Sequence, residues 1–407
     1  MNFTYLSKEW QSINEKMDNI WSFIFLSLLS LSFVVTDWMV GIFSWSDFIF
    51  GIILFFMVIG GNYILKKEQI GLFVAVFIVV FLNIFLSNIY NEHFELSVGI
   101  AGLIKISFYL VTIVGLYNFI KKRKLEKKVL FSLNIVAVIV SIIGIYITIA
   151  IYSNGQLPFD FFWLFTRSDR LSYSFNWNEN LIRTRSIFSE PSYFGYYLNI
   201  ILGMNYFNKT TPETSKWLNL FLTIMIILTF SYSSIAIMVV VQILKGFDFI
   251  KNKSFKWNNF YFLYIMILFF VIYLFWDTFS ETLIQRTLNI LSGEDSSAIN
   301  RITTSWQYIN TNYLFLGNGI GHTPSIWNIY AYMLSDFGII VFICSIIFTG
   351  YIMNNNFRLG VLFLLLNFQK GGYLSNSFWI YLLLLFLFID TQKNRNNVHM
   401  KLKLNRI

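Results

Sequence analysis

Charge is scarce in this chain of 407 residues, of which Asp, Glu, Lys and Arg together make up only 13%. Soluble domains carry roughly 25% charged residues, so this sequence cannot cover a globular surface with charge. The shortage excludes a soluble enzyme, a disordered protein and a nucleic-acid-binding protein. The formal net charge of +9 does not restore a nucleic-acid partner, because the placement of the basic residues has another explanation, given below.

Cysteine and histidine are almost as rare. One Cys and three His exclude a disulfide framework and argue against a metal cluster built from protein ligands. The sequence also has no dinucleotide-binding glycine motif and no recognisable acidic metal motif. We therefore expect no metal and no cofactor.

Long apolar runs dominate what is present, since 56% of the residues are hydrophobic and 20% are aromatic. A bilayer-spanning helix needs about 20 mostly apolar residues, and such runs predict an all-α polytopic integral membrane protein with about twelve transmembrane helices. We expect one membrane domain over 1–407, without a cleavable signal peptide, because the first residues are polar. The predicted spans are 20–40, 42–65, 70–90, 97–120, 129–152, 192–207, 217–231, 234–247, 258–277, 326–352, 357–370 and 375–390.

The basic residues follow the positive-inside rule. With both termini cytoplasmic, the short inside segments hold most of the Lys and Arg, above all the cluster in 121–128. If 217–247 were one helix, Lys251, Lys253 and Lys256 would lie outside. We therefore predict two helices there, joined by a tight outside turn at 231–234. The excess positive charge is thus mostly a signal of topology.

Two long outside loops remain, at 153–191 and 278–325, and we expect both to be ordered and functional. Every basic residue in them is Arg, whose planar fork binds phosphate or carboxylate in two places. This bias favours an anion-binding outer face. The alternative is that these arginines pair with acids of the same loops. The arginines are Arg167, Arg170, Arg183, Arg185, Arg286 and Arg301.

The end of the first loop is the densest polar stretch, with Arg183 and Arg185 shortly before Glu190. Ser189 suits a helix N-cap and Pro191 is tolerated in a first helical turn. Glu190 therefore lies where a loop enters a membrane helix. It could simply complement the helix dipole, or it could orient a hydroxyl or hold the two arginines.

The motif Phe-x-Glu-Pro-Ser-x-Phe-Gly at 188–195 resembles the Wzy-type polysaccharide polymerases, in the same broad superfamily as the O-antigen ligases. The resemblance continues in the second loop, where 297–301 reads Ser-x-x-x-Arg, Trp306 follows, and 316–322 is a glycine run ending in His322. Residues 327–339 are similar to the family's next helix. Tyr232 stands where the family has an Arg, so one expected base is missing. The similarity covers roughly 150–340.

The resemblance implies a glycosyltransferase on the outer face of the bacterial plasma membrane. It would join repeat units carried on undecaprenyl pyrophosphate into a capsule, an O-antigen or an exopolysaccharide. Donor and acceptor would both be lipid-linked oligosaccharides, and a chain-length regulator is a possible further partner besides membrane lipid. No nucleotide sugar is available outside, and arginines instead of a metal would stabilise the leaving pyrophosphate.

The resemblance also suggests roles for single residues. Arg183, Arg185 and Arg301 would bind the pyrophosphate, and Glu190 would orient the acceptor or the arginines. His322 is a candidate base for the acceptor hydroxyl, or else a structural loop histidine. The predicted catalytic set is Arg301, Glu190 and His322.

Three further charged residues lie in or beside predicted spans. Lys105 and Asp336 should be roughly 12 and 15 Å below the outer surface at 1.5 Å per residue. Buried ionisable groups are usually paired or line a cavity, so we expect these two to pair. Lys370, near the outer end of its span, either joins the anion site or extends to the headgroups.

Three other functions stay open. A ligase would transfer finished glycan to a different acceptor. A lipid-linked oligosaccharide flippase or other transporter would concentrate its charges in a central cavity. A non-catalytic membrane protein, such as a receptor, is compatible with the composition, although the motif at 188–195 argues against it.

Overall fold

The computed structural model describes residues 3–41, 43–153, 156–166, 174–175, 178–208, 214–251, 266–267, 269–270, 273–274, 276–370 and 372–389. The predicted all-α class is confirmed, because α-helices dominate and the only strands among these residues form two short hairpins. Arg167 and Arg170, the C-terminal segment 391–407, which is predicted to be cytoplasmic, and most of the span predicted at 258–277 lie outside this set.

The N-terminal half consists of five long or apolar helices and one hairpin. Helix α2 begins with a reciprocal cap, in which Ser44 Oγ accepts from the Asp47 amide and Asp47 Oδ2 accepts from the Ser44 amide, satisfying two amides that a helix start leaves open. The elements are α1 (Phe3–Val34), β1 (Met39–Val40), β2 (Phe43–Ser44), α2 (Trp45–Ile59), α3 (Lys67–Tyr90), α4 (Leu96–Lys122) and α5 (Glu126–Tyr152).

The two loops and the helices around them form the rest of the chain. The first loop contains a 3₁₀ turn (Asp160–Trp163) and the hairpin β3 (Ser174–Phe175) and β4 (Asn178–Ile182). The second contains α10 (Trp276–Phe279), a π-helical stretch (Ser280–Gln285), α11 (Arg286–Leu291), α12 (Ser296–Ile302) and a 3₁₀ turn (Thr304–Trp306). The remaining helices are α6 (Pro191–Phe207), α7 (Lys216–Leu228), α8 (Tyr232–Lys251), α13 (Ile329–Asn355), α14 (Phe357–Gln369) and α15 (Asn376–Ile389).

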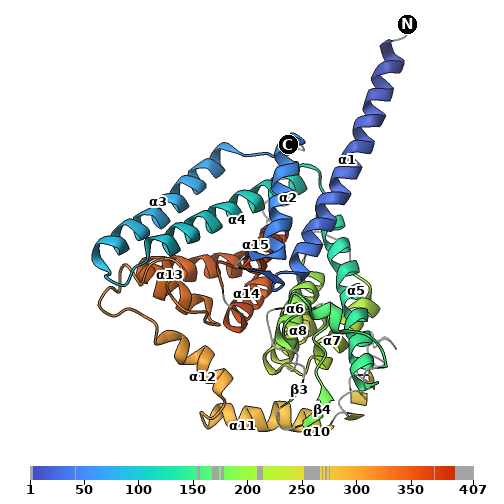
Figure 1. Ribbon diagram of the computed structural model, residues 1–407. Helices are drawn as coiled ribbons and strands as arrows, with labels where there is room; N and C mark the ends of the chain where they lie inside the picture. Colours follow the sequence, from blue (N-terminus) through green and yellow to red (C-terminus); the bar gives the residue numbers. More distant parts are fainter. Residues whose placement is uncertain are drawn as a thin grey trace.

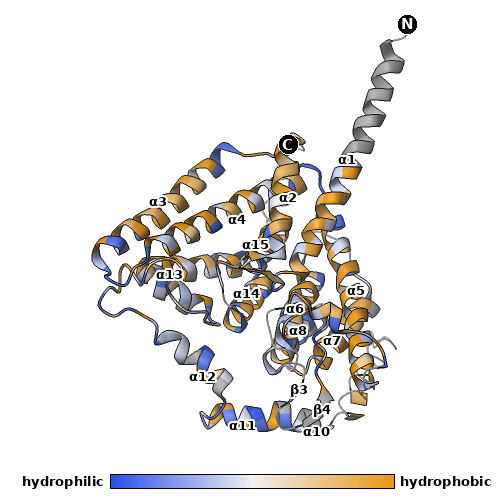
Figure 2. Ribbon diagram, in the orientation of Figure 1, coloured by the Kyte–Doolittle hydropathy of each residue, from blue (hydrophilic) through white to orange (hydrophobic). Residues whose placement is uncertain are grey.

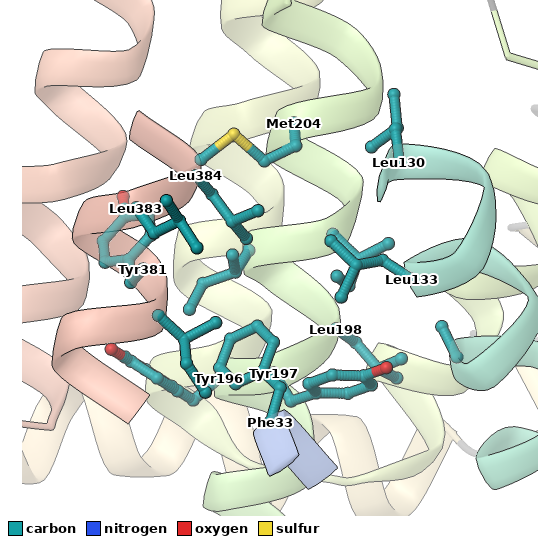
Figure 3. Close-up of a cluster of buried hydrophobic side chains, with 14 of the residues drawn as sticks. Phe33, Leu130, Leu133, Tyr196, Tyr197, Leu198, Met204, Tyr381, Leu383 and Leu384 are labelled. Carbon is teal, nitrogen blue, oxygen red and sulfur yellow. The ribbon is translucent and has the colours of Figure 1, made fainter. Parts of the chain in front are cut away.

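Helix α6 is the centre of the packing. It contacts α5, α7, α8, α14 and α15, and its residues from Phe194 to Asn205 are all buried. Tyr196, Tyr197 and Leu198 face side chains of α5 and α15 in the cluster of Figure 3. A Cβ on Gly195 would lie 2.3 Å from Ser234 Oγ, so Gly195 permits the close contact of α6 with α8.

The number of full-length spans is smaller than the sequence predicts. Four helices, namely α3, α4, α5 and α13, are long and apolar enough to cross a membrane, and six further apolar helices have 10–17 residues. These counts refer to the described residues. The expectation of about twelve full spans is therefore wrong, because several of the apolar runs form helices of only 10–17 residues, short of the roughly 20 that a bilayer requires. The two helices predicted in 217–247 are confirmed as α7 and α8.

The two chain termini and the helices of the second loop lie at opposite ends of the molecule. In Figure 1 the start of α1 and the last described turn of α15 lie at one end of the molecule, and α10, α11 and α12 lie at the other. The helices α3, α4 and α5 are mainly hydrophobic in Figure 2, whereas α12 is pale to blue. Four candidate spans and this arrangement suggest a multi-pass membrane protein.

Helix α13 is broken at Gly338, where φ is 78° and ψ is −173°. The glycine run of the second loop closes the break. Asn318 N donates to Ser335 O at 2.6 Å, Gly319 N donates to Asp336 O at 3.0 Å, and Ile339 N donates to Leu314 O at 2.9 Å. Backbone groups opened inside a membrane helix need such partners. The run is thus a strap across the broken helix.

Candidate functional site

Glu190 caps helix α6. Its backbone is extended, with φ −139° and ψ 151°, and Pro191 occupies the first helical turn. The expected cap, Ser189, is instead used elsewhere: its amide donates to Asp37 Oδ2 at 2.8 Å and its hydroxyl donates to the same oxygen. The prediction of Ser189 as N-cap is therefore wrong by one residue. This leaves the Glu190 side chain at the start of α6.

Lys370 pairs with Glu190. It follows the last residue of α14, and its Nζ lies 3.2 Å from Glu190 Oε2, which also accepts from Ser192 Oγ at 2.8 Å. The same ammonium lies 3.3 Å from the centre of the Tyr193 ring and 4.3 Å from that of Trp327. Aromatic faces attract cations. Lys370 is only 8% exposed, so it is held among these groups and does not extend to the headgroups.

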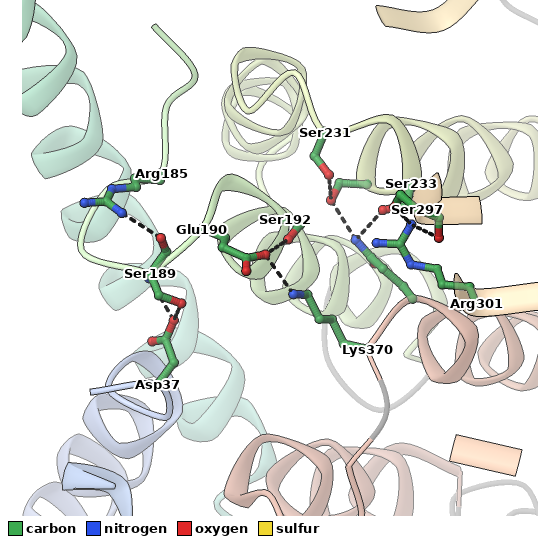
Figure 4. Close-up of polar contacts among 12 residues, drawn as sticks. Asp37, Arg185, Ser189, Glu190, Ser192, Ser231, Ser233, Ser297, Arg301 and Lys370 are labelled. Carbon is green, nitrogen blue, oxygen red and sulfur yellow. Dashed lines mark hydrogen bonds and ion pairs between the residues drawn. The ribbon is translucent and has the colours of Figure 1, made fainter. Parts of the chain in front are cut away.

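Two loop arginines lie close to this pair. Arg301 Nη1 donates to Ser297 Oγ at 2.6 Å, and its guanidinium carbon is 6.0 Å from the Trp327 ring centre. Its Nε is buried without a hydrogen-bond acceptor in the described part of the chain. Arg183 Nε donates to Thr229 O at 3.4 Å. Helices α6, α12 and α14 and the turn before α8 therefore converge here (Figure 4).

The charges of the cluster influence one another. Burial lowers the pKa of Lys370 to about 8, against the opposing effect of the Glu190 carboxylate. Burial also lowers the pKa of Arg183 to about 10, and the nearby Arg286 acts in the same direction. Burial and then Arg286 lower the pKa of Arg301. Four cations, Lys370, Arg183, Arg301 and Arg286, thus act on one another here, against the carboxylates of Glu190, Asp295 and Asp37. The cluster therefore keeps a net positive charge.

Glu190 remains ionised in these surroundings. Burial alone would raise the pKa of its carboxyl, but Lys370, the Ser192 hydroxyl and Arg183 lower it by more, so the net shift is downward. An ionised carboxylate only accepts hydrogen bonds. Glu190 can therefore orient a hydroxyl donor or hold Lys370, and it is a poor proton acceptor at neutral pH.

Arg286 belongs to the rim of the cluster. Its Nε contacts Asp295 Oδ2 at 2.7 Å, and its guanidinium carbon lies 5.6 Å from the Tyr232 ring centre. This is the loop ion pair that the alternative reading of the arginines anticipates. The alternative reading is therefore confirmed for Arg286, while anion binding by Arg301 stays a prediction.

Arg185 lies apart from the other arginines. It is 1% exposed, its Nη1 donates to Ser189 O at 2.6 Å, and its guanidinium carbon is 3.6 Å from the Trp163 ring centre. In Figure 4 it points away from Glu190 and Lys370, on the side of Asp37. Its placement favours a role in holding the first loop against α6 over a role in binding pyrophosphate.

His322 is also held by structural contacts. Its Nε2 accepts from the Glu95 amide at 2.8 Å, its Nδ1 lies 3.0 Å from Ile320 O, and its ring stacks on Phe94 at 4.3 Å. Both ring nitrogens are therefore used in attaching the strap to the turn between α3 and α4. The structure supports the loop-histidine alternative, and it does not bring His322 into contact with Glu190 or Lys370.

The expected pair of Lys105 and Asp336 does not form. The Asp336 carboxylate accepts instead from the amides of Gly321 at 3.0 Å and Thr323 at 2.9 Å, and from the Tyr373 hydroxyl. Lys105 lies 5.8 Å from the Tyr109 ring centre. Equal depth in two helices is not sufficient to predict an ion pair. Here the strap supplies backbone amides that satisfy Asp336, and hydropathy does not predict where that loop segment lies.

The sequence does not predict the aromatic rings around Lys370 or the amide of Gln369 beside it. Tyr193 and Trp327 carry no charge, so charge alone does not identify them, although a cation nearby favours such aromatic faces. Gln369 donates to Ser233 Oγ at 3.2 Å and to Ser234 Oγ at 2.8 Å, tying the turn before α8 to the residue that precedes Lys370. No signal in the sequence identifies that contact.

No group of three or more His, Cys, Asp or Glu suited to a metal ion occurs among the described residues. Comparison with protein-family models, with curated proteins and with solved structures finds no match.

Proposed function

We propose that this chain is a polysaccharide polymerase of the bacterial plasma membrane, with both termini in the cytoplasm and the cluster around Glu190 on the outer face. It would transfer a glycan from undecaprenyl pyrophosphate to a hydroxyl of a second lipid-linked repeat unit. The observation that carries the proposal is the meeting of Lys370, Arg183 and Arg301 around one carboxylate.

The cationic excess fits a pyrophosphate leaving group. In the transfer, the acceptor oxygen bonds to the sugar carbon while the bond from that carbon to the pyrophosphate breaks. Negative charge then develops on the departing oxygen, and pre-positioned cations stabilise it. Arg301 offers a buried Nε that has no acceptor in the described residues, which an incoming phosphate oxygen would satisfy.

Glu190 would have two partners in turn. Without substrate it neutralises Lys370 across 3.2 Å. When pyrophosphate binds Lys370, the carboxylate can turn to accept a hydrogen bond from the acceptor hydroxyl. Its lowered pKa suits this orienting role. The proton of the acceptor hydroxyl passes to the departing pyrophosphate, since both His322 nitrogens are already in use.

The geometry favours this reading over a transporter. A flippase needs its charges along a central path, whereas the ionic cluster here lies where α6 and α8 begin and α14 ends. Helix N-termini add positive potential at the same place. The resemblance of 188–195 and 297–322 to the Wzy-type polymerases points in the same direction.

The test is polymer length in a strain that lacks the gene and carries plasmid variants. Arg301→Ala should abolish long polysaccharide chains. Arg301→Lys should yield few of them, because an ammonium cannot form the two parallel hydrogen bonds of a guanidinium. Lys122→Ala, an exposed residue at the other end of the molecule, is the control. Long chains at wild-type level in both Arg301 variants, at normal protein abundance, would exclude this role for Arg301.

The lipid carrier in the strain without the gene separates the alternatives. Single repeat units that accumulate on the outer leaflet support a polymerase. Long chains that stay on the carrier support an O-antigen ligase-like transfer. Repeat units that remain on the inner leaflet support a flippase.

A further inference from the structure

A groove separates α5 from α7 at the end of the molecule opposite the Glu190 cluster. It measures about 690 Å³ and is walled by Phe131, Ile135, Val138 and Ile139 of α5 and by Leu218 of α7. Phe131, Ile135 and Ile139 are 67%, 43% and 51% exposed. The walls are therefore apolar and accessible from the side of the helix pair.

Two polar side chains that line this groove, Asn134 and Thr214, are hydrogen-bonded within the protein. Asn134 exchanges two hydrogen bonds of 2.8 Å with Asn205, and Asn205 Nδ2 also donates to Asn219 Oδ1 at 2.9 Å. Asn219 Nδ2 in turn donates to Thr214 Oγ1 at 3.0 Å. A chain of paired amides makes no demand for a polar ligand, so the interior of the groove suits an apolar one.

The mouth of the groove is basic. Lys127 and Lys128 line it, both are exposed, and none of the ion pairs among the described residues involves them. Their neighbour Lys121 differs, because it pairs with Glu126 at 3.3 Å and donates to Leu387 O. Two lysines thus remain available at the edge of an apolar channel.

The length of the groove matches one leaflet. From Lys128 to Ile139 a helix advances by about 16 Å at 1.5 Å per residue, and half of a hydrocarbon core is about 15 Å. A protein helix in the groove would carry its own polar backbone ends and side chains, for which the walls offer no partner. A lipid matches both parts of the groove, because its anionic headgroup suits the two lysines and its acyl chain suits the apolar walls.

We propose that this groove binds one anionic phospholipid of the cytoplasmic leaflet. Its phosphate lies between Lys127 and Lys128, and one acyl chain runs along Phe131, Ile135 and Val138. Basic pockets between membrane helices on the cytoplasmic side favour such headgroups. The choice of leaflet rests on the topology of the proposed function, but the site does not depend on the polymerase activity, since it lies at the other end of the molecule.

The experiment is native mass spectrometry of the full-length protein in detergent, with phosphatidylglycerol and phosphatidylethanolamine of identical acyl chains. Wild type should retain one phosphatidylglycerol in preference. Lys127→Gln/Lys128→Gln should bind it roughly tenfold more weakly, because each lysine near an anionic headgroup contributes to affinity. Lys122→Gln/Lys124→Gln removes equal charge from exposed positions outside the groove and should have no effect.

A second pair of variants tests the apolar wall. Val138→Trp fills the groove and should remove the bound lipid, whereas Ile142→Trp, on an exposed face of α5 outside the groove, should not. Equal retention of both lipids by wild type overturns the proposal. So do equal losses in the two lysine pairs, or a dimer of the chain that Val138→Trp disrupts. Thermal unfolding of each variant identifies any that fails to fold.

Discussion

Lys370 is almost fully buried, which is rare for a lysine. Burial disfavours its charge, while Glu190 and the faces of Tyr193 and Trp327 favour it. The resulting pKa of about 8 lies about one unit above neutral pH. A buried cation with such a value is typical of functional sites, and it makes the charge of the cluster depend on pH.

The first prediction concerns this pH dependence. Because the pKa of Lys370 is lowered to about 8, its ammonium is charged below pH 8 and neutral above it. Polymerisation by the purified protein in vesicles should therefore fall as the pH rises through 8. In Lys370→Arg the guanidinium stays charged, so the decline should move to higher pH.

The measurement is polymer yield on gels between pH 6.5 and 9.5, at matched protein amounts. Exposed Lys122→Arg is the control and should keep the wild-type profile. If Lys370→Arg declines at the same pH as wild type, then Lys370 does not set the alkaline limb.

The second prediction separates two arginines that the sequence treats alike. Arg185 is enclosed by Ser189 and Trp163, so Arg185→Met should lower the free energy of unfolding by roughly 2 kcal/mol, as for a lost charged hydrogen bond. Arg183→Met should lower polymer yield at least tenfold with a smaller loss of stability. Thermal unfolding in detergent and polymer gels measure the two effects, and the reverse ranking would contradict the assignment.

At the scale of the element, the broken helix α13 links the second loop to the membrane. A Cβ on Gly338 would lie 2.3 Å from Phe315 O, and Gly338 has φ 78°. The strap, from Leu314 to His322, crosses at this point. Asp336, just before the break, holds the strap and Tyr373 together. Since Tyr373 is three residues after Lys370, the break and the candidate site share one support.

The third prediction tests this break. Gly338→Ala adds both left-handed strain and a clash with backbone, and it should destabilise the protein by about 2 kcal/mol or more. Gly350→Ala, in the same helix with nothing within 4 Å of the added Cβ, should be neutral or slightly stabilising. The measurement is thermal unfolding in detergent, and equal melting temperatures for the two variants would contradict a strained break.

Several elements could be predicted from the sequence because one physical signal dominates them. The apolar run at 129–152 gave α5 (Glu126–Tyr152), and the charge argument at 217–247 gave two helices. The break at Gly338 could not be foreseen, since hydropathy continues through it. Hydropathy also does not predict that α6 is enclosed by other helices, because apolar residues face lipid and protein alike.

The candidate site was predicted in part. Glu190, Lys370 and Arg301 were identified by charge in an apolar chain, and the structure brings them together. Arg185 and His322 were chosen by residue type, but their partners Trp163, Ser189, Glu95 and Phe94 come from other parts of the chain. Such contacts depend on tertiary packing, which spacing along one sequence does not encode.

At the scale of the whole molecule, basic residues occupy both ends but differ in kind. Lysines gather in 121–128, where α4 ends and α5 begins, and Arg286 and Arg301 lie in α11 and α12, at the end of the molecule opposite the start of α1 (Figure 1). Lys370 is close enough to Arg301 for the two charges to repel. Lysine near the headgroups fixes orientation through its charge alone. Arginine in a buried cluster offers directed hydrogen bonds. The separation predicts that the two ends face different compartments.

The fourth prediction is this sidedness. Cys344 is the one cysteine of the chain, so Cys344→Ser gives a background for single cysteines placed at exposed positions. In whole cells with a permeable outer envelope, a charged maleimide should label Ser292→Cys, beside α11, and should leave Lys122→Cys unlabelled until the plasma membrane is opened. The reason is that the lysine-rich end stays cytoplasmic. Labelling of Lys122→Cys in intact cells would invert the topology and move the Glu190 cluster away from outer-leaflet substrates.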